Sequence, residues 1–127
     1  MTPVPAGINK KSFSLFYNGG EIWCEHLDAL GQSTELLNQK FAEDLKLISR
    51  PSTSSYLAIC MDQTKVSEEI LEMIIASLSR LVKPIKKVAF IGLNPAMKRY
   101  VMKRTKSLNI LFVCMDDYEK AKAWLIP

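Results

Sequence analysis

Hydrophobic and polar positions change their spacing several times along the chain, and each change predicts a new element. Residues 13–17 and 21–27 are two short extended runs, and Asn18-Gly19 stands between them. Both residues of this pair tolerate the positive φ that a tight hairpin turn requires. The pattern predicts an antiparallel β-hairpin near the N-terminus.

Apolar residues at helical spacing follow the hairpin. Leu37, Phe41 and Ile48 fall on one face of a segment that begins with a possible N-cap, Ser33 or Thr34. Pro51 prevents the segment from continuing as a helix. We therefore expect a helix from Ser33 or Thr34 to about Ile48.

Three continuously apolar runs come next, at 56–61, 88–93 and 109–115. Short runs of this kind are typical of strands that are buried on both faces of a parallel sheet. An amphipathic segment follows each run, and the middle one of the three starts at Asn94-Pro95, a helix-start signal. These features predict three strands, each followed by a helix.

The helix after the first of these strands has the clearest limits. Ser67 is a good N-cap, and Glu68 and Glu69 favour the positive end of the helix dipole. An apolar stripe continues to Val82, and Pro84 is expected to end the helix.

The predicted order is β-β-α-β-α-β-α-β-α, which defines the fold class as α/β. We expect residues 12–127 to form a single domain with four helices and a mixed, mostly parallel sheet of about five strands. Residues 1–11 contain two prolines and are expected to be a flexible N-terminal arm.

Composition is that of a globular protein: 127 residues, 48% of them hydrophobic and 24% charged. No apolar run is long enough to cross a bilayer, and the opening residues lack the order of a signal peptide. We expect a cytoplasmic protein.

The three cysteines, Cys24, Cys60 and Cys114, form no CxxC pair, and His26 is the one histidine. A zinc site with the usual spacing is therefore not expected. The favoured interpretation is that all three cysteines are small buried hydrophobic residues in a reducing compartment. Cys24 and His26 would share one face of a strand, which leaves a reactive pair as the alternative, without a visible orienting group.

Sequence motifs for nucleotide binding and for serine hydrolysis are missing. The chain contains no GxGxxG, no GxxxxGK[ST] and no GxSxG. We therefore expect no cofactor, no metal and no enzymatic activity.

Cys-Met-Asp occurs twice, and in each copy the aspartate, Asp62 or Asp116, ends a predicted parallel strand. Carboxyl ends of parallel strands share one edge of a sheet, where α/β proteins bind ligands. A weak cation or phosphoryl site is one interpretation. The favoured one is that acidic residues suit the starts of helices.

Charge is unevenly distributed along a chain with a net charge of +4. Nine basic residues and no acidic residue lie between positions 73 and 115. Four of them, expected on the outer side of one helix, form a candidate basic face: Lys98, Arg99, Lys103 and Arg104. A solvated surface is the favoured interpretation, and nucleic-acid binding is the alternative.

Residues 56–126 carry a resemblance to a known family. It rests on the strand that ends in Asp62, the helix capped by Ser67, the run Val-Ala-Phe-Ile-Gly at 88–92 and the ending Asp-Tyr-Glu-Lys-Ala-Lys-Ala-Trp-Leu at 117–125. This stretch resembles the STAS family, the fold of bacterial anti-sigma-factor antagonists. Within that family it is most similar to the divergent branch that is also compared with CRAL-TRIO lipid-transfer domains.

The resemblance implies a domain that works by binding a partner. In antagonist-type members a serine or threonine at the position of Ser67 is phosphorylated, although Val66 and Glu68 here stand where those members have aspartate and glycine. We expect a non-enzymatic regulatory or protein-interaction domain of STAS-like fold. Its partner-binding or switch candidates are Asp62, Thr64, Ser67 and Asn94.

Two other functions remain open from the sequence. One is a carrier for a small apolar molecule or lipid, which would need an apolar cavity. The other is a nucleic-acid-binding accessory protein that uses the basic face with weak, non-specific affinity.

Overall fold

The hairpin forms where Asn18-Gly19 predicts it. In the computed structural model, which describes residues 5–127, strand β1 (Phe13–Tyr17) pairs antiparallel with strand β2 (Gly20–His26). Asn18 and Gly19 have φ values of 50° and 80°, as in the turns whose twist matches that of paired strands.

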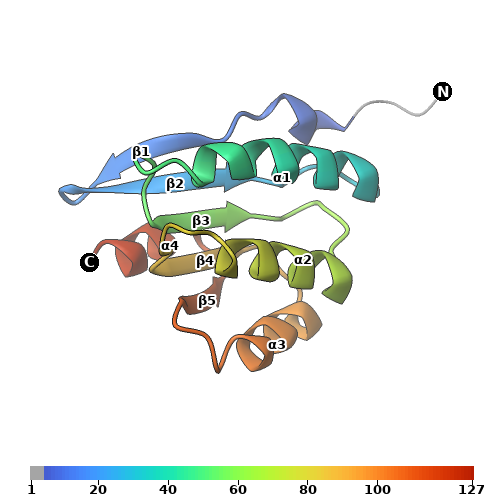
Figure 1. The fold of residues 1–127 in the computed structure, drawn as a ribbon. Coiled ribbons are helices and arrows are strands. Elements are labelled where there is room, and N and C mark those ends of the chain that lie inside the picture. Colours follow the sequence, from blue (N-terminus) through green and yellow to red (C-terminus); the bar gives the residue numbers. More distant parts are fainter. Residues whose placement is uncertain (1–4) are drawn as a thin grey trace.

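The three apolar runs form parallel strands, as predicted. The strand order is β1-β2-β3-β4-β5, and only the β1–β2 pairing is antiparallel (Figure 1). The fold is therefore a single α/β domain with a mixed, mostly parallel five-stranded sheet. The bounds of the last three strands are Tyr56–Cys60 for β3, Lys87–Ile91 for β4 and Leu111–Met115 for β5.

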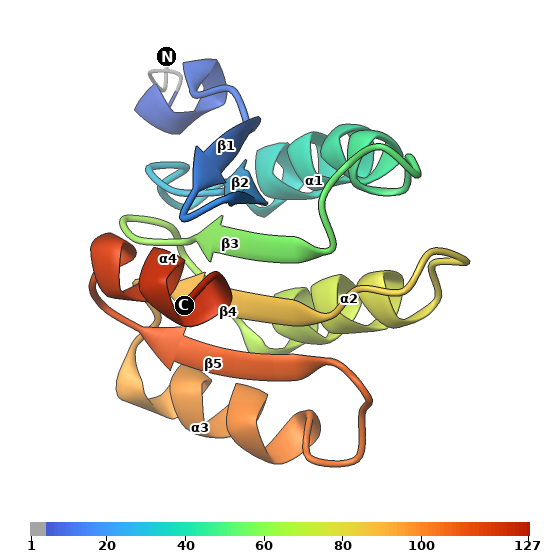
Figure 2. The same cartoon turned by 90° about the vertical axis from the view of Figure 1, so that its left-hand side faces the viewer.

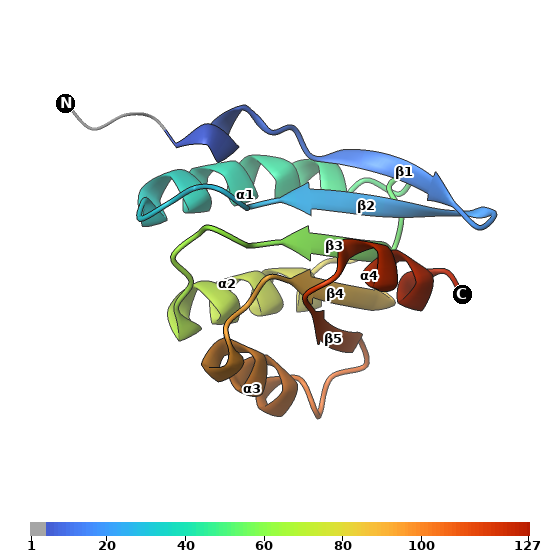
Figure 3. The same cartoon turned by 180° about the vertical axis from the view of Figure 1, so that it is seen from behind.

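The helices are divided unequally between the two faces of the sheet. Three helices cover one face, and α4 alone lies on the other (Figures 2 and 3). Their bounds are Thr34–Ile48 for α1, Glu68–Ser79 for α2, Pro95–Arg104 for α3 and Tyr118–Leu125 for α4. No helix within residues 5–127 combines the length and apolar character that a membrane span requires.

Side-chain size along the strands explains this division. Successive residues of a strand point to opposite faces. Large side chains such as Leu57 and Phe90 are buried beneath α1, α2 and α3, whereas Ala58 and Ala89 point to the other side. Their small size lets α4 approach the sheet through Ala121.

Helix α2 ends earlier than Pro84, which corrects one expectation. Its last residue is Ser79, and Val82 is fully exposed instead of extending the apolar stripe. After α2 the chain turns, and Lys83 reaches back to the end of α1. Its Nζ donates hydrogen bonds to the carbonyl oxygens of Arg50 (3.0 Å) and Thr53 (2.7 Å), and also to that of Ile48.

The segment expected as a flexible arm lies only partly within the described structure, because residues 1–4 are outside it. Ala6–Asn9 form a short 3-10 helix. The N–H of Gly7 donates to the Ala29 carbonyl oxygen at 2.7 Å, and Lys10 forms an ion pair with Asp28. These contacts attach residues 7–10 to the loop that follows β2.

Candidate functional site

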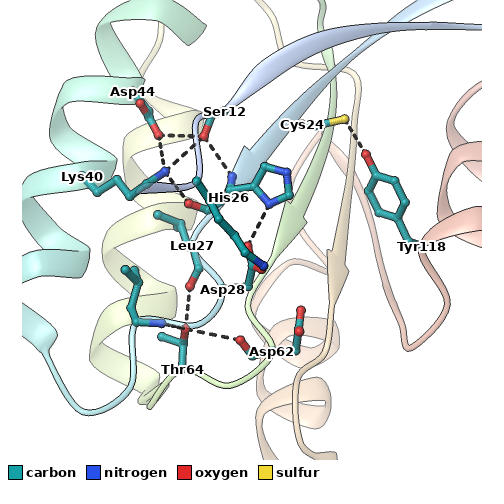
Figure 4. A network of polar contacts seen from close by, with 12 residues as sticks. Ser12, Cys24, His26, Leu27, Asp28, Lys40, Asp44, Asp62, Thr64 and Tyr118 are labelled. Carbon is teal, nitrogen blue, oxygen red and sulfur yellow. Dashed lines mark hydrogen bonds and ion pairs between the residues drawn. The ribbon is translucent and has the colours of Figure 1, made fainter. Parts of the chain in front are cut away.

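The candidate site lies at the edge of the sheet where the parallel strands end. The loops after β2 and β3 meet there, and Figure 4 shows their polar contacts. This is the edge at which α/β proteins bind ligands, and it is where the sequence placed Asp62.

Backbone hydrogen bonds join these two loops. The N–H of Ala29 donates to the Asp62 carbonyl oxygen at 2.8 Å, and the N–H of Lys65 donates to that of Gly31 at 2.8 Å. Gly31 and Thr64 form an isolated parallel bridge. The β2–α1 and β3–α2 loops therefore form one connected unit.

The Thr64 hydroxyl strengthens this connection. Its Oγ1 donates to the Leu27 carbonyl oxygen at 2.7 Å and accepts from the Leu30 N–H at 3.0 Å (Figure 4). Both partners belong to the β2–α1 loop. Thr64, one of the sequence candidates, thus positions the loop with its side chain.

Three neighbouring side chains point away from this framework. Asp62, Gln63 and Lys65 are all exposed, and none has a side-chain hydrogen bond or ion pair among residues 5–127. Gln63 has a φ of 55°, a conformation that is uncommon outside glycine. We call these three residues the recognition triplet.

The β4–α3 loop approaches the same loop closely. Gly92 has a φ of 89°, and a Cβ atom at this position would lie 2.7 Å from the Cβ of Asp62. Only glycine allows this approach.

The other two candidates, Ser67 and Asn94, are N-caps. The Ser67 Oγ accepts from the N–H of Ile70 at 3.2 Å, and the Asn94 Oδ1 accepts from that of Met97 at 2.9 Å. Both side chains therefore satisfy backbone groups at the starts of α2 and α3.

A cavity of about 450 Å³ opens beside the recognition triplet, between the starts of α1 and α2. Polar Asn38, Lys65 and Glu69 line it together with Ile70 and Met73. A polar rim around an apolar floor is a usual composition for a partner-binding surface.

His26 has an orienting partner that was not among the sequence candidates. Its Nδ1 lies 2.8 Å from Oδ1 of Asp28, whose Oδ2 pairs with Lys10 at 2.5 Å. Burial favours a higher pKa for Asp28, but the hydrogen bonds from Lys10 and His26 outweigh it and hold the pKa below its ordinary value. Asp28 follows His26 by two residues, and this spacing was the sequence signal for a partner on the same side of the strand.

The Cys24 thiol does not pair with His26. Its Sγ instead contacts the Tyr118 Oη at 2.7 Å (Figure 4). Burial raises the pKa of the Cys24 thiol, and burial with the nearby negative charge of Asp28 raises that of Cys60 to about 12. Cys24 and Cys60 are buried thiols, and Cys114 is half-buried.

A buried carboxyl group that was not among the sequence candidates lies beneath α1. Glu25 is fully buried, and its Oε2 has no hydrogen-bond partner among the described residues. Burial, and then the facing carboxylate of Asp44, raise the pKa of Glu25 far above that of an ordinary carboxyl. Asp44 itself is held by Ser12 at 2.8 Å and by Lys40 at 3.3 Å.

Two of the four residues of the basic face form ion pairs within the fold. Lys98 pairs with Asp116 at 2.7 Å, and Arg104 pairs with Glu72 through two hydrogen bonds of 2.6 and 2.9 Å. Exposed Arg99 and Lys103 remain. They line a cavity of about 700 Å³ together with Glu68, Ala96, Tyr100 and Arg104.

A scan against models of protein families, and searches among curated proteins and among solved structures, found no match to this chain.

Proposed function

We propose that this chain is a non-enzymatic regulatory or protein-interaction domain of STAS-like fold, and that it binds another protein through the recognition triplet. The observation that carries this proposal is the presentation of Asp62, Gln63 and Lys65 on a loop whose backbone is joined to its neighbour.

Rigid presentation favours binding for a thermodynamic reason. A loop that is already ordered loses little conformational entropy when a partner docks on it. The triplet offers a carboxylate, an amide and an ammonium group within four consecutive positions. A protein surface with polar groups of matching charge is the partner that this arrangement suits.

The neighbouring cavity adds apolar area to the same surface. Ile70 and Met73, one turn apart on α2, line it; Ile70 is buried and Met73 is half-buried. A partner could place one apolar side chain there while it contacts the triplet, which is the usual division between a hot spot and its polar rim.

The STAS-like assignment is part of this proposal, and phosphorylation of Ser67 is not required for it. Glu68 and Glu69 follow the Ser67 hydroxyl directly, so a phosphate there would meet two negative charges. The free cysteines support a reducing compartment, and we propose the cytoplasm.

Two observations argue against the alternatives. A carrier needs apolar space, whereas the layer between the sheet and α1–α3 is filled by side chains such as Phe41 and Phe90. Nucleic-acid binding would depend on Arg99 and Lys103 once the two paired residues are discounted.

The test compares two sets of variants of the full chain. One replaces Asp62, Gln63 and Lys65 with alanine; the control replaces Lys106 and Asn109, which are exposed near the other ends of the strands. Each variant is used to capture partners from cells of the source organism, with quantitative mass spectrometry as the readout.

We expect the triplet variant to recover at least about tenfold less of a specific protein than the wild type and the control. Thr64→Val should give an intermediate loss, because it removes the hydroxyl that links the loops. Equal recovery by all variants would contradict the proposal. An apolar molecule that is retained in native mass spectra would favour the carrier function instead.

A further inference from the structure

Strand β1 is an edge of the sheet with an unusual surface. Phe13–Tyr17 pair only with β2, and the sequence Phe-Ser-Leu-Phe-Tyr contains no charge, no proline and no glycine. Phe16 is 81% exposed and Phe13 is 44% exposed. Edge strands usually carry charges, prolines or bulges that prevent pairing with another chain, and β1 has none of these.

The hairpin register determines which backbone groups of β1 face outward. Tyr17 and Gly20 flank the two-residue turn and form a hydrogen-bonded pair, so Leu15 and Phe13 do the same with β2. The N–H and C=O groups of Ser14 and Phe16 therefore point to the open edge. No hydrogen bond within residues 5–127 reaches these outward groups.

The open edge ends at Ser12. The Ser12 Oγ accepts from the backbone N–H of His26 at 2.9 Å, in place of a backbone pairing. The chain leaves the sheet there, toward the contact between Lys10 and Asp28. The free edge is therefore short and has defined limits.

We propose that β1 is the interface with a second copy of this chain. The two β1 strands pair antiparallel about a two-fold axis at Leu15, so that two five-stranded sheets become one continuous sheet. Ser14 lies opposite Phe16 of the second copy, and Phe16 lies opposite its Ser14. This register gives every outward N–H and C=O group of both strands a partner.

Side chains fit the same register. Phe13 lies opposite Tyr17 of the second copy, and Leu15 lies opposite its own symmetry mate. Aromatic pairs and aliphatic pairs are favourable across antiparallel strands. Each exposed Phe16 ring packs across the small Ser14 side chain of the other copy.

Charge distribution favours β1 over the other edge for a second copy. The net charge is +4, and the exposed basic residues Arg99, Lys103 and Lys106 lie on or just after α3. Helix α3 lies beside β5, at the opposite edge of the sheet from β1 (Figure 2). Pairing through β1 therefore keeps the two basic regions far apart, whereas pairing through β5 would bring them together.

A five-residue edge buries little surface, so the dimer is weak and depends on concentration. Sedimentation equilibrium of the full chain from about 1 µM to about 1 mM is the first measurement. We expect a monomer–dimer equilibrium without larger species. A monomer throughout this range, or open-ended association, would overturn the proposal.

Ser14→Pro tests the edge directly. The Ser14 N–H points to solvent in the monomer, so proline removes an intermolecular donor but no bond to β2. We expect dimerisation to weaken at least about tenfold, because two hydrogen bonds are lost across the symmetric interface. Ser14→Thr is the matched control and should dimerise like the wild type.

Cross-linking tests the register even if the proline variant is unstable. Leu15→Cys places two thiols opposite each other, where Cα atoms about 4.5 Å apart suit a disulfide. Ser14→Cys places them more than about 7 Å apart, beyond that range. We expect a disulfide-linked dimer from Leu15→Cys only. Equal yields from both variants, or none from Leu15→Cys, would overturn the proposal.

Discussion

The Trp23 indole Nε1 donates a hydrogen bond of 2.9 Å to Oε1 of Glu25, two residues further along β2. Both side chains lie under α1, where the Glu25 carboxyl meets Asp44. Burial and the facing Asp44 carboxylate raise the pKa of Glu25 more than the Trp23 hydrogen bond lowers it, so the folded chain keeps this carboxyl protonated at a pH at which an ordinary glutamate has lost its proton.

This arrangement makes stability depend on pH. The raised pKa of Glu25 means that its contribution is complete below the ordinary carboxyl range and is lost progressively as the pH rises toward the folded-state pKa. Glu25→Gln imitates the protonated side chain. We expect the variant to match the wild type near pH 4 and to become increasingly more stable as the pH rises, by up to about 1.4 kcal/mol per pH unit.

Urea unfolding of both proteins between pH 4 and pH 9 measures this difference. Asp44→Asn removes the facing charge but leaves Glu25 buried, so it should reduce the pH dependence without abolishing it. Parallel stability curves for the wild type and Glu25→Gln would contradict the prediction.

Lys83 should stabilise the end of α1. Its Nζ is the common donor to three carbonyl oxygens there, and burial lowers the pKa of this ammonium group. Lys83→Met keeps the aliphatic stem and removes the donor. We expect a loss of about 1–2 kcal/mol in unfolding free energy, measured by thermal or urea denaturation. Lys86→Met, at an exposed lysine, should change it by less than about 0.5 kcal/mol.

Ser67 should act first as a helix cap. Ser67→Ala removes the acceptor for the Ile70 N–H, and we expect it to lower stability by about 1 kcal/mol. Ser67→Asp retains an acceptor and should keep most of the stability. If Ser67→Ala left stability unchanged but abolished partner recovery, the capping interpretation would be wrong and the switch interpretation would gain.

Binding to nucleic acid should be weak and should depend on Arg99 and Lys103. Changing both to glutamate is expected to abolish any binding to unrelated oligonucleotides without lowering the melting temperature. Binding by the wild type should fade as salt approaches physiological concentration. Strong binding to one oligonucleotide at that salt would contradict the prediction.

Arg104→Glu provides the contrast within the basic face. It removes the two hydrogen bonds to Glu72 and places two acids together, so the melting temperature should fall. The sequence offered no sign of this pairing, because the two residues lie on different helices, 32 positions apart.

Local chemistry explains which parts of the fold were predictable. Asn18-Gly19 forms its turn through the φ values of two adjacent residues, and Ser67 and Asn94 cap helices through bonds to residues three positions ahead. Such signals lie within a few positions of the structure that they determine. The apolar runs of the parallel strands are equally local.

Contacts between distant segments explain what was missed. Lys83, just after α2, bonds to carbonyl groups that lie 30 to 35 positions away. Thr64 was a candidate by its place in a loop, but its bond to Leu27 spans 37 positions. Glu25 looks like one polar residue in a strand until α1 brings Asp44 to it.

The position of α4 has a consequence for the growing chain during synthesis. Ile22, Cys24, Ala58 and Ala89 are buried on the face that Ala121 and Leu125 cover, and those two residues are made after the four that they cover. A nascent chain that has emerged only as far as β5 would present this apolar face to the cell. Chaperones are expected to recognise such an intermediate, and a stop codon before residue 118 would make it permanent.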